Sequence, residues 1–138
     1  MKRAQTAAIF VIIVFAATAL FGCSPSGPEG VAQAFVSAMK SRDTEAAAKH
    51  WNYITTARQQ NENWDEIPEG QRNLIIGKLQ EARAKELEYW TQYFGPETTI
   101  VEVTEMGDKA EATLRGGRAG VLKLVKIDER WYVDGLRQ

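Results

Sequence analysis

One stretch near the end of the sequence decides the fold: residues 109–136, which read KAEATLRGGRAGVLKLVKIDERWYVDGL. In its first seven residues, small or apolar side chains alternate strictly with polar ones. Ala110, Ala112 and Leu114 fall on one side, and charged or hydroxyl side chains fall on the other. Successive side chains of a β-strand point to opposite faces, so this alternation predicts a strand with one buried face and one face in water.

Three further segments predict strands that pair with this one. Residues 98–105 are rich in β-branched side chains, and apolar runs occupy residues 119–127 and 131–136. Short turn sequences separate them, with Gly116 and Gly117 as a hairpin signal and residues 128–130 as a charged turn. Short connections between successive strands imply antiparallel pairing, so we expect a sheet of about four strands.

The sequence before these strands has helical periodicity. Apolar residues at i, i+4, i+7 and i+8 predict a helix over residues 28–40, and these residues are Val31, Phe35, Ala38 and Met39. Asp43 is well placed to cap a second helix. That second helix is expected to carry Ala47, Trp51 and Ile54 on one face.

The middle of the chain predicts a loop followed by a long helix. Residues 58–63 are rich in Gln and Asn and have no periodicity, which indicates a solvated loop. The loop leads to Trp64, which would serve either as part of a lid or as a docked indole. Residues 68–94 predict a helix. Glycine is unfavourable inside a helix, so this helix would be either continuous or kinked or broken at Gly77. Helices first and strands last indicate an α+β fold with N-terminal helices packed on one face of an antiparallel sheet.

Two segments resemble a known group of proteins. They are the opening of the first helix, Pro28-Glu29-Gly30-Val31 with Ala34-Phe35, continued by Ser41-Arg42-Asp43, and the closing stretch from Leu124 to Val133. Both resemble small bacterial lipoproteins of unknown function in the nuclear transport factor 2-like superfamily, also called cystatin-like cones. The resemblance implies a strongly curved sheet wrapped around helices, often with an open cavity. It leaves the activity open.

The first 22 residues have the composition of an export signal. Lys2 and Arg3 precede an uncharged run of 15 residues, 7–21, which is shorter than the roughly 20 residues that span a bilayer. The run ends in Leu20-Phe21-Gly22-Cys23, which resembles the lipobox of bacterial lipoproteins. That resemblance implies cleavage between Gly22 and Cys23 and acylation of Cys23. The alternative is an uncleaved anchor helix with an incidental cysteine.

An acylated Cys23 would anchor a single domain, residues 28–138, to a membrane of the bacterial cell envelope through a short tether, residues 23–27. Two or three acyl chains hold a protein almost permanently. Ser24, where inner-membrane lipoproteins of enteric bacteria have Asp, favours the outer membrane facing the periplasm. Four extended residues reach at most ~14 Å. Any partner must therefore come close to the membrane surface.

Composition excludes several function classes. Without residues 1–22 the chain keeps 116 residues, with 15 basic and 18 acidic side chains, a net charge of −3. This balance offers no basic stripe for nucleic acid. A single cysteine excludes an internal disulfide, and one cysteine with one histidine argues against a zinc site. We expect no metal or cofactor.

Each candidate site has two possible roles, one functional and one structural. His50 is the one histidine and would be a general base or simply a packing residue. Gly116 and Gly117, between Arg115 and Arg118, would bind an anion or, as we favour, form a hairpin turn. Several aromatic residues would line a pocket for an apolar ligand or form the core, namely Trp51, Tyr53, Trp90, Tyr93, Phe94 and Trp131.

The sequence favours a non-enzymatic envelope lipoprotein that binds a small apolar ligand or a protein partner near the membrane. One alternative is an enzyme of the isomerase or dehydratase type found in the same superfamily, with His50 or an inward-facing acid as the base. Another is a structural subunit of an envelope assembly, or a homodimer that associates through the sheet face.

Overall fold

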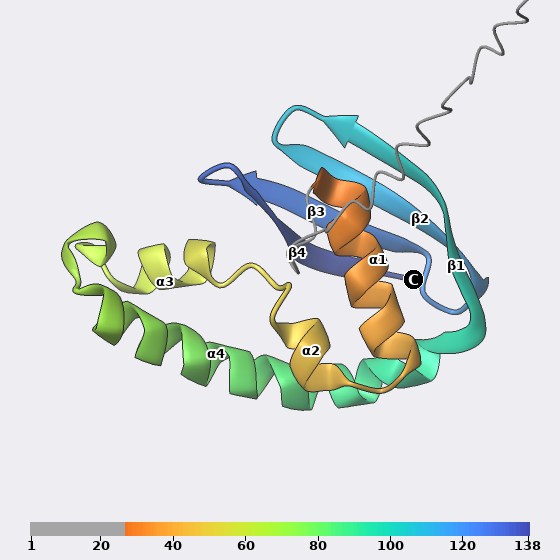
Figure 1. Cartoon of the computed structure of the whole chain (residues 1–138), viewed down its shortest axis with the longest axis horizontal. Helices are drawn as coiled ribbons and strands as arrows, with labels where there is room; N and C mark the ends of the chain where they lie inside the picture. The colour runs from red at the N-terminus through yellow and green to blue at the C-terminus, as the bar shows by residue number, and fades with distance from the viewer. Residues whose placement is uncertain (1–26) are drawn as a thin grey trace, which may run out of the picture.

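The computed structural model describes residues 27–138 and shows helices packed against one four-stranded sheet (Figure 1). The α-helices are α1 (Gly27–Lys40), α2 (Thr44–Ala48), α3 (Ile54–Gln60) and α4 (Glu69–Trp90), with 3-10 turns η1 (Trp64–Glu66) and η2 (Thr91–Tyr93). The strands are β1 (Phe94–Met106), β2 (Lys109–Gly117), β3 (Val121–Ile127) and β4 (Arg130–Arg137). The predicted α+β class is confirmed. The predicted signal, residues 1–22, and Cys23 lie outside the described residues.

The sheet is an antiparallel meander in the order β1-β2-β3-β4, so β1 and β4 form its two edges. The register of β1 against β2 shifts twice, between Phe94 and Thr99 and between Ile100 and Glu102. An extra residue in one strand bends it and increases its twist. The long strand β1 accordingly curves along α1 (Figure 1).

Helix α1 fills the hollow of the sheet. Its side chains Phe35 and Met39 are fully buried, and the small residues Ala110 and Ala112 of β2 are buried with them in the same core. Small residues on the strand leave room for large ones on the helix, which gives dense packing without strain. Leu122, Leu124 and Val133 complete this core. The predicted first helix is confirmed to within one residue.

The second helix is shorter than the sequence predicts. Asp43 caps it as expected, because the N–H of Ala46 donates to Asp43 Oδ1 at 3.0 Å. The helix then ends at Ala48, so the predicted continuation to Ile54 is wrong. The cause is pairing with β4: Asn52 N–H donates to the Val133 carbonyl, and Val133 N–H donates to the His50 carbonyl, each at 2.7 Å. This distant strand takes the backbone bonds that a longer helix would use.

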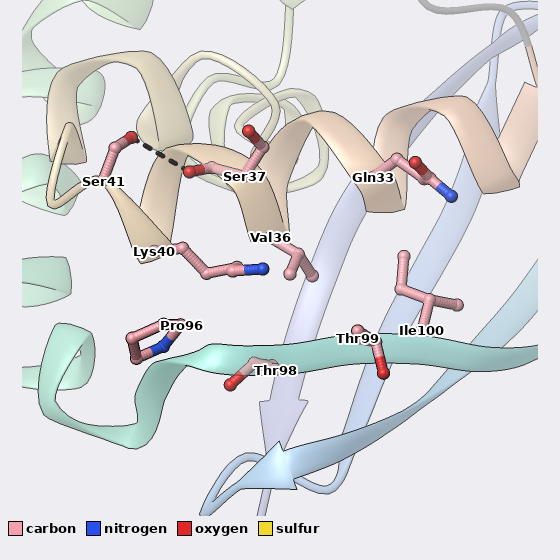
Figure 2. Close-up of a pocket in the computed structure, with 9 residues that line it drawn as sticks. All are labelled: Gln33, Val36, Ser37, Lys40, Ser41, Pro96, Thr98, Thr99 and Ile100. Carbon is pink, nitrogen blue, oxygen red and sulfur yellow. Dashed lines mark hydrogen bonds between the residues drawn. The ribbon is translucent and has the colours of Figure 1, made fainter.

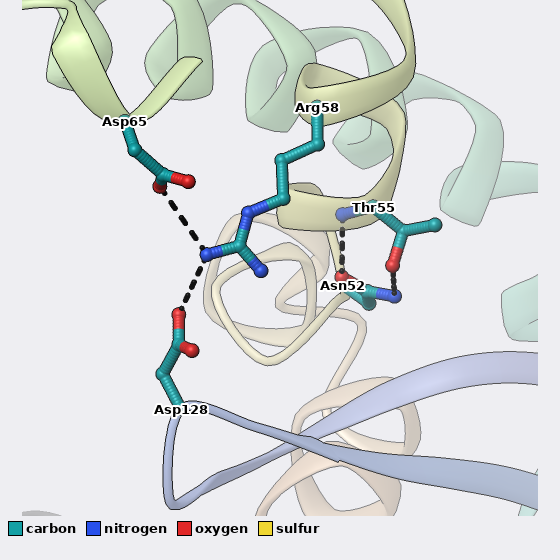
Figure 3. Close-up of polar contacts among 5 residues, drawn as sticks. All are labelled: Asn52, Thr55, Arg58, Asp65 and Asp128. Carbon is teal, nitrogen blue, oxygen red and sulfur yellow. Dashed lines mark hydrogen bonds and ion pairs between the residues drawn. The ribbon is translucent and has the colours of Figure 1, made fainter. Parts of the chain in front are cut away.

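The predicted loop over residues 58–63 is helical in its first half, where α3 runs to Gln60. Buried Asn52 organises the start of this helix (Figure 3). Its Oδ1 accepts from the Thr55 N–H at 3.3 Å, and its amide group donates to the Thr55 hydroxyl at 2.8 Å and to Asp134 Oδ1 at 2.9 Å. A side-chain oxygen that accepts from the first turn is a strong helix start signal.

Helices α3 and α4 form an arm that extends beyond the sheet (Figure 1). Helix α4 runs through Gly77 as one helix and ends at Trp90, earlier than predicted. Trp64 is buried at 6% exposure, which agrees with a docked indole. Arg58 connects the arm to the β3–β4 turn, with Asp65 at 3.3 Å and Asp128 at 3.0 Å (Figure 3). Both carboxylates are exposed, so these ion pairs contribute little stability.

The connection between β2 and β3 lies slightly later than predicted. β2 continues through Gly116 and Gly117, and residues 118–120 form the turn. Gly116 has φ +81°, and a Cβ atom there would collide with the carbonyl of Glu97 in β1. The two glycines therefore allow β1 to approach β2 closely. Within residues 27–138, no helix combines the length and apolar character needed to cross a membrane.

The β3–β4 turn carries backbone strain, which yields a stability prediction. Its two central residues, Asp128 and Glu129, have φ +49° and +65°, a type I′ geometry that favours Asn or Gly. We expect Glu129→Gly to raise the free energy of unfolding by about 1 kcal/mol, because the left-handed conformation strains residues with a Cβ atom. Urea denaturation measures this change.

Glu129→Ala is the matched control. It removes the same carboxylate, and with it the ion pair to Lys126, but keeps the Cβ atom. It should give no gain in stability. Equal effects of the two substitutions would contradict the strain argument.

Candidate functional site

A groove of about 780 Å³ lies between α1 and the edge strand β1 (Figure 2). One wall is formed by helix residues and the other by strand residues. Helix α1 contributes Gln33, Val36, Ser37 and Lys40, the turn after it contributes Ser41, and the strand contributes Pro96, Thr98, Thr99 and Ile100. Its volume falls within the range of ordinary ligand sites.

The helix wall of the groove is the polar face of the amphipathic helix α1. The apolar face of the helix is buried in the sheet, while Gln33, Ser37 and Lys40 are exposed at i, i+4 and i+7 along β1. Helix and strand run in opposite directions, with Lys40 near Pro96 and Gln33 near Ile100 (Figure 2). Seven helical residues span ~10 Å. That length matches about three residues of extended chain.

Thr98 shapes the strand side of the groove. It is 1% exposed, and its hydroxyl accepts from the Gly95 N–H at 2.9 Å and donates to the Gly116 carbonyl at 2.7 Å. These two bonds lie where the pairing of β1 with β2 is irregular. The Thr98 hydroxyl therefore bonds backbone groups where the regular pairing of β1 with β2 is interrupted.

Lys40 is the charged side chain among the groove residues, and it extends between α1 and β1 (Figure 2). Among residues 27–138 no ion pair involves Lys40. The neighbouring Ser41 hydroxyl is already used, since it contacts the Ser37 and Ala38 carbonyls at 2.9 and 3.1 Å. Lys40 thus offers the groove a positive charge that the described part of the chain does not neutralise.

His50 lies away from this groove. Its backbone carbonyl accepts from Val133, and the side chain is partly buried. Burial, with a smaller effect from the charge of Lys49, lowers the pKa of His50 below its usual value near 6.5. The imidazole is therefore neutral at pH 7. None of the hydrogen bonds described for residues 27–138 links its side chain to a carboxylate that would orient it.

The aromatic residues proposed for a ligand pocket do not line this groove. Trp51 and Phe94 flank Phe35 in the core, with ring centroids 6.0 and 6.2 Å away. The Tyr53 hydroxyl donates to the Ala48 carbonyl at 2.6 Å, and burial raises the pKa of Tyr53. Trp90 packs on Tyr93 at 5.2 Å, and Trp131 is partly buried against the core.

Two of these aromatic residues have further neighbours. The Arg83 guanidinium lies 4.5 Å above the Trp51 ring, a cation–π contact. Tyr53 lines a small cavity of about 100 Å³ beside α4. In these surroundings Trp51 and Tyr53 pack between α4 and the rest of the domain.

The glycine–arginine segment lies at the β2–β3 connection. Arg115 and Arg118 are exposed, and the Arg118 N–H donates to the Tyr93 carbonyl at 3.0 Å, so this backbone group is used internally. In the part of the chain that the structure describes, no three histidine, cysteine or acidic side chains gather in a way that would hold a metal ion.

Comparisons with known proteins leave the function of this chain open. No protein-family model matches the chain, and no curated protein matches its sequence. A solved structure from Campylobacter jejuni, provisionally described as an NTF2-like transpeptidase, aligns with a TM-score of 0.47 and 19% identity, over 80% of this chain and 99% of that one. A likeness at this level supports no statement about activity.

Sequence reasoning missed the groove residues. The helix side of the groove has the residue types of any solvent-exposed helix face, namely Gln33, Ser37 and Lys40. The strand side, Thr98 to Ile100, has the residue types of any β-strand. The one available signal was the unusual length of the β-branched run that begins at Thr98. The length of this run does not show that the strand lies at an edge of the sheet.

Thr98 and its neighbour give a matched pair of substitutions. Thr98→Val keeps the shape of the side chain but leaves the Gly95 N–H and the Gly116 carbonyl without their partner. We expect a loss of about 1–2 kcal/mol in the free energy of unfolding. Thr99→Val changes an exposed hydroxyl and should stay within about 0.5 kcal/mol of the parent. Equal losses in thermal or urea unfolding would contradict this role.

Proposed function

We propose that this protein is a lipid-anchored binding protein of the bacterial cell envelope, and that it binds an extended polypeptide segment of a partner in the groove between α1 and β1. One observation carries the proposal: a groove of about 780 Å³ lies between a helix and a sheet edge. An added strand can hydrogen-bond to such an edge while its side chains contact the helix.

The chemistry of the groove favours a polypeptide over a small apolar molecule. Hydroxyl, amide and ammonium groups alternate there with a few apolar side chains, and the groove is open along its length. An edge strand also presents a row of N–H and C=O groups that only another backbone can match. The interior of the sheet, where an apolar ligand would sit, is filled by Phe35 and Met39 of α1.

The proposed anchor sets the position of the groove. Helix α1 begins at Gly27, four residues after the cysteine of the lipobox-like segment. If Cys23 is acylated, the first turn of α1 lies within ~14 Å of the membrane surface. The groove runs along α1, so one of its ends would face the membrane. A partner anchored in or near the same membrane could then reach it.

Blocking the groove tests the binding proposal. Ser37 is exposed and is one of the residues that line the groove, so the bulky side chain of Ser37→Trp should obstruct the site without disturbing the core. Peptides selected from a random displayed library against the detergent-solubilised protein provide the probe. We expect Ser37→Trp to weaken their binding at least tenfold, as measured by fluorescence anisotropy.

Thr113→Trp is the control for this test, because it adds the same ring on an exposed position of β2 that does not line the groove. It should leave binding unchanged. Failure to select any peptide, or unchanged binding by Ser37→Trp, would overturn the binding proposal.

The anchor has a separate test. Cys23→Ser should abolish labelling by a palmitate analogue in cells and leave an unacylated, unanchored precursor. Membrane fractionation and mass spectrometry of the N-terminus report the result. A variant that is cleaved normally and still sediments with membranes would show that Cys23 is not the anchor.

A further inference from the structure

We infer that the groove selects a segment with an apolar side chain and an acidic side chain two positions apart. This inference rests on the proposed function and specifies the partner for the same site. It comes from the spacing of the side chains on α1, compared with the spacing of side chains on an extended chain.

The apolar position is set by Val36 and Ile100. Val36 is 5% exposed and Ile100 is partly buried, and they lie on the two walls of the groove (Figure 2). A partner side chain that enters between them contacts Val36 and removes the exposed apolar surface of Ile100 from water. Polar groups flank this position on the helix side, where Gln33 and Ser37 are located. The apolar contact is therefore local and fixes the register of the partner.

The acidic position is set by Lys40. Lys40 follows Val36 by four residues, so the two side chains lie on the same face of α1, ~6 Å apart along the helix axis. On an extended chain, residues i and i+2 share a face and are separated by ~6.6 Å. The two spacings agree within an ångström. A strand that places an apolar residue at Val36 thus places its next same-side residue at Lys40.

Charge determines the preference at that second position. Lys40 has no ion-pair partner among residues 27–138, so a carboxylate on the ligand would be its first. Exposed Glu102 and Glu105 lie on β1 beyond Ile100, away from Lys40, whereas exposed Glu97 follows Pro96 at the Lys40 end. Glu102 and Glu105 repel a carboxylate at the far end of the groove, and Lys40 attracts one at its own end. A partner acid is thus favoured at one place and disfavoured at others.

The same acids argue against a second copy of this chain as the occupant. Antiparallel pairing of two β1 edges would bring three glutamates from each copy onto one shared edge. Like charges across a strand pair are destabilising. The bulge between Ile100 and Glu102 further shortens the regular edge available for such pairing.

Charge reversal tests the inference. Peptide libraries are selected in parallel against the detergent-solubilised parent protein and the Lys40→Glu variant. The parent should enrich an apolar residue and an Asp or Glu that are two positions apart. The variant should replace that acid by Lys or Arg, with a change of roughly tenfold in relative affinity for a matched pair of peptides. Lys49→Glu, an exposed lysine outside this groove, should leave the parent preference intact.

The outcomes separate this inference from the binding proposal. If Ser37→Trp abolishes peptide binding but Lys40→Glu leaves the acidic preference unchanged, the groove binds peptides and the specificity inference is wrong. If Ser37→Trp has no effect, both are wrong. Two other results would overturn the inferred occupant: a concentration-dependent dimer that Ser37→Trp dissociates, or a lipid-sized mass in native mass spectrometry that Ser37→Trp removes.

Discussion

The packing of α1 into the curved sheet is the contact on which the rest of the structure depends. Phe35 and Met39 of α1 are fully buried and share one core with the small residues Ala110 and Ala112 of β2. Truncating either large residue would leave a cavity that the rigid sheet closes only in part, at a cost of several kcal/mol. Because the helix occupies the concave face of the sheet, that face is filled, and the groove described above lies at the edge of the sheet.

The sheet has two unequal edges. At β4, residues 50–52 pair with Val133, and Asn52 bonds to Asp134, so part of this edge is covered. At β1 no further strand follows within residues 27–138, and α1 stands beside the edge with a groove between them. Natural proteins blunt such edges with bulges, proline and charge. β1 has all three, in Pro96, the shift after Ile100, and Glu102. The usable edge is therefore short, which suits a short partner segment.

Much of the fold is predictable from the sequence because it is local. The apolar stripe of α1, the alternation in β2 and the cap at Asp43 each depend on residues within one element, and the structure confirms all three. The end of α2 and the start of α3 are different. They depend on Val133 and on Asp134, which is 82 residues from its partner Asn52, so no local pattern predicts them.

The candidate site was less predictable than the fold. Its side chains are of the types expected on any solvated helix or strand, and the groove exists because of the distance between α1 and an edge strand. The sequence drew attention instead to aromatic residues, which more often form the core. Phe94 and Trp51 do pack around Phe35, and Tyr53 bonds to the backbone of α2.

The most direct measurement is backbone hydrogen exchange of the purified protein with and without a selected peptide. Strand addition at β1 predicts slower exchange at outer-edge amides near residues 98–103, together with slower exchange in the neighbouring turns of α1. The outer edge of β4 and the α2–α4 interface should exchange as before. Slowing confined to those other places, or no slowing at β1 when the peptide is bound, would contradict the account.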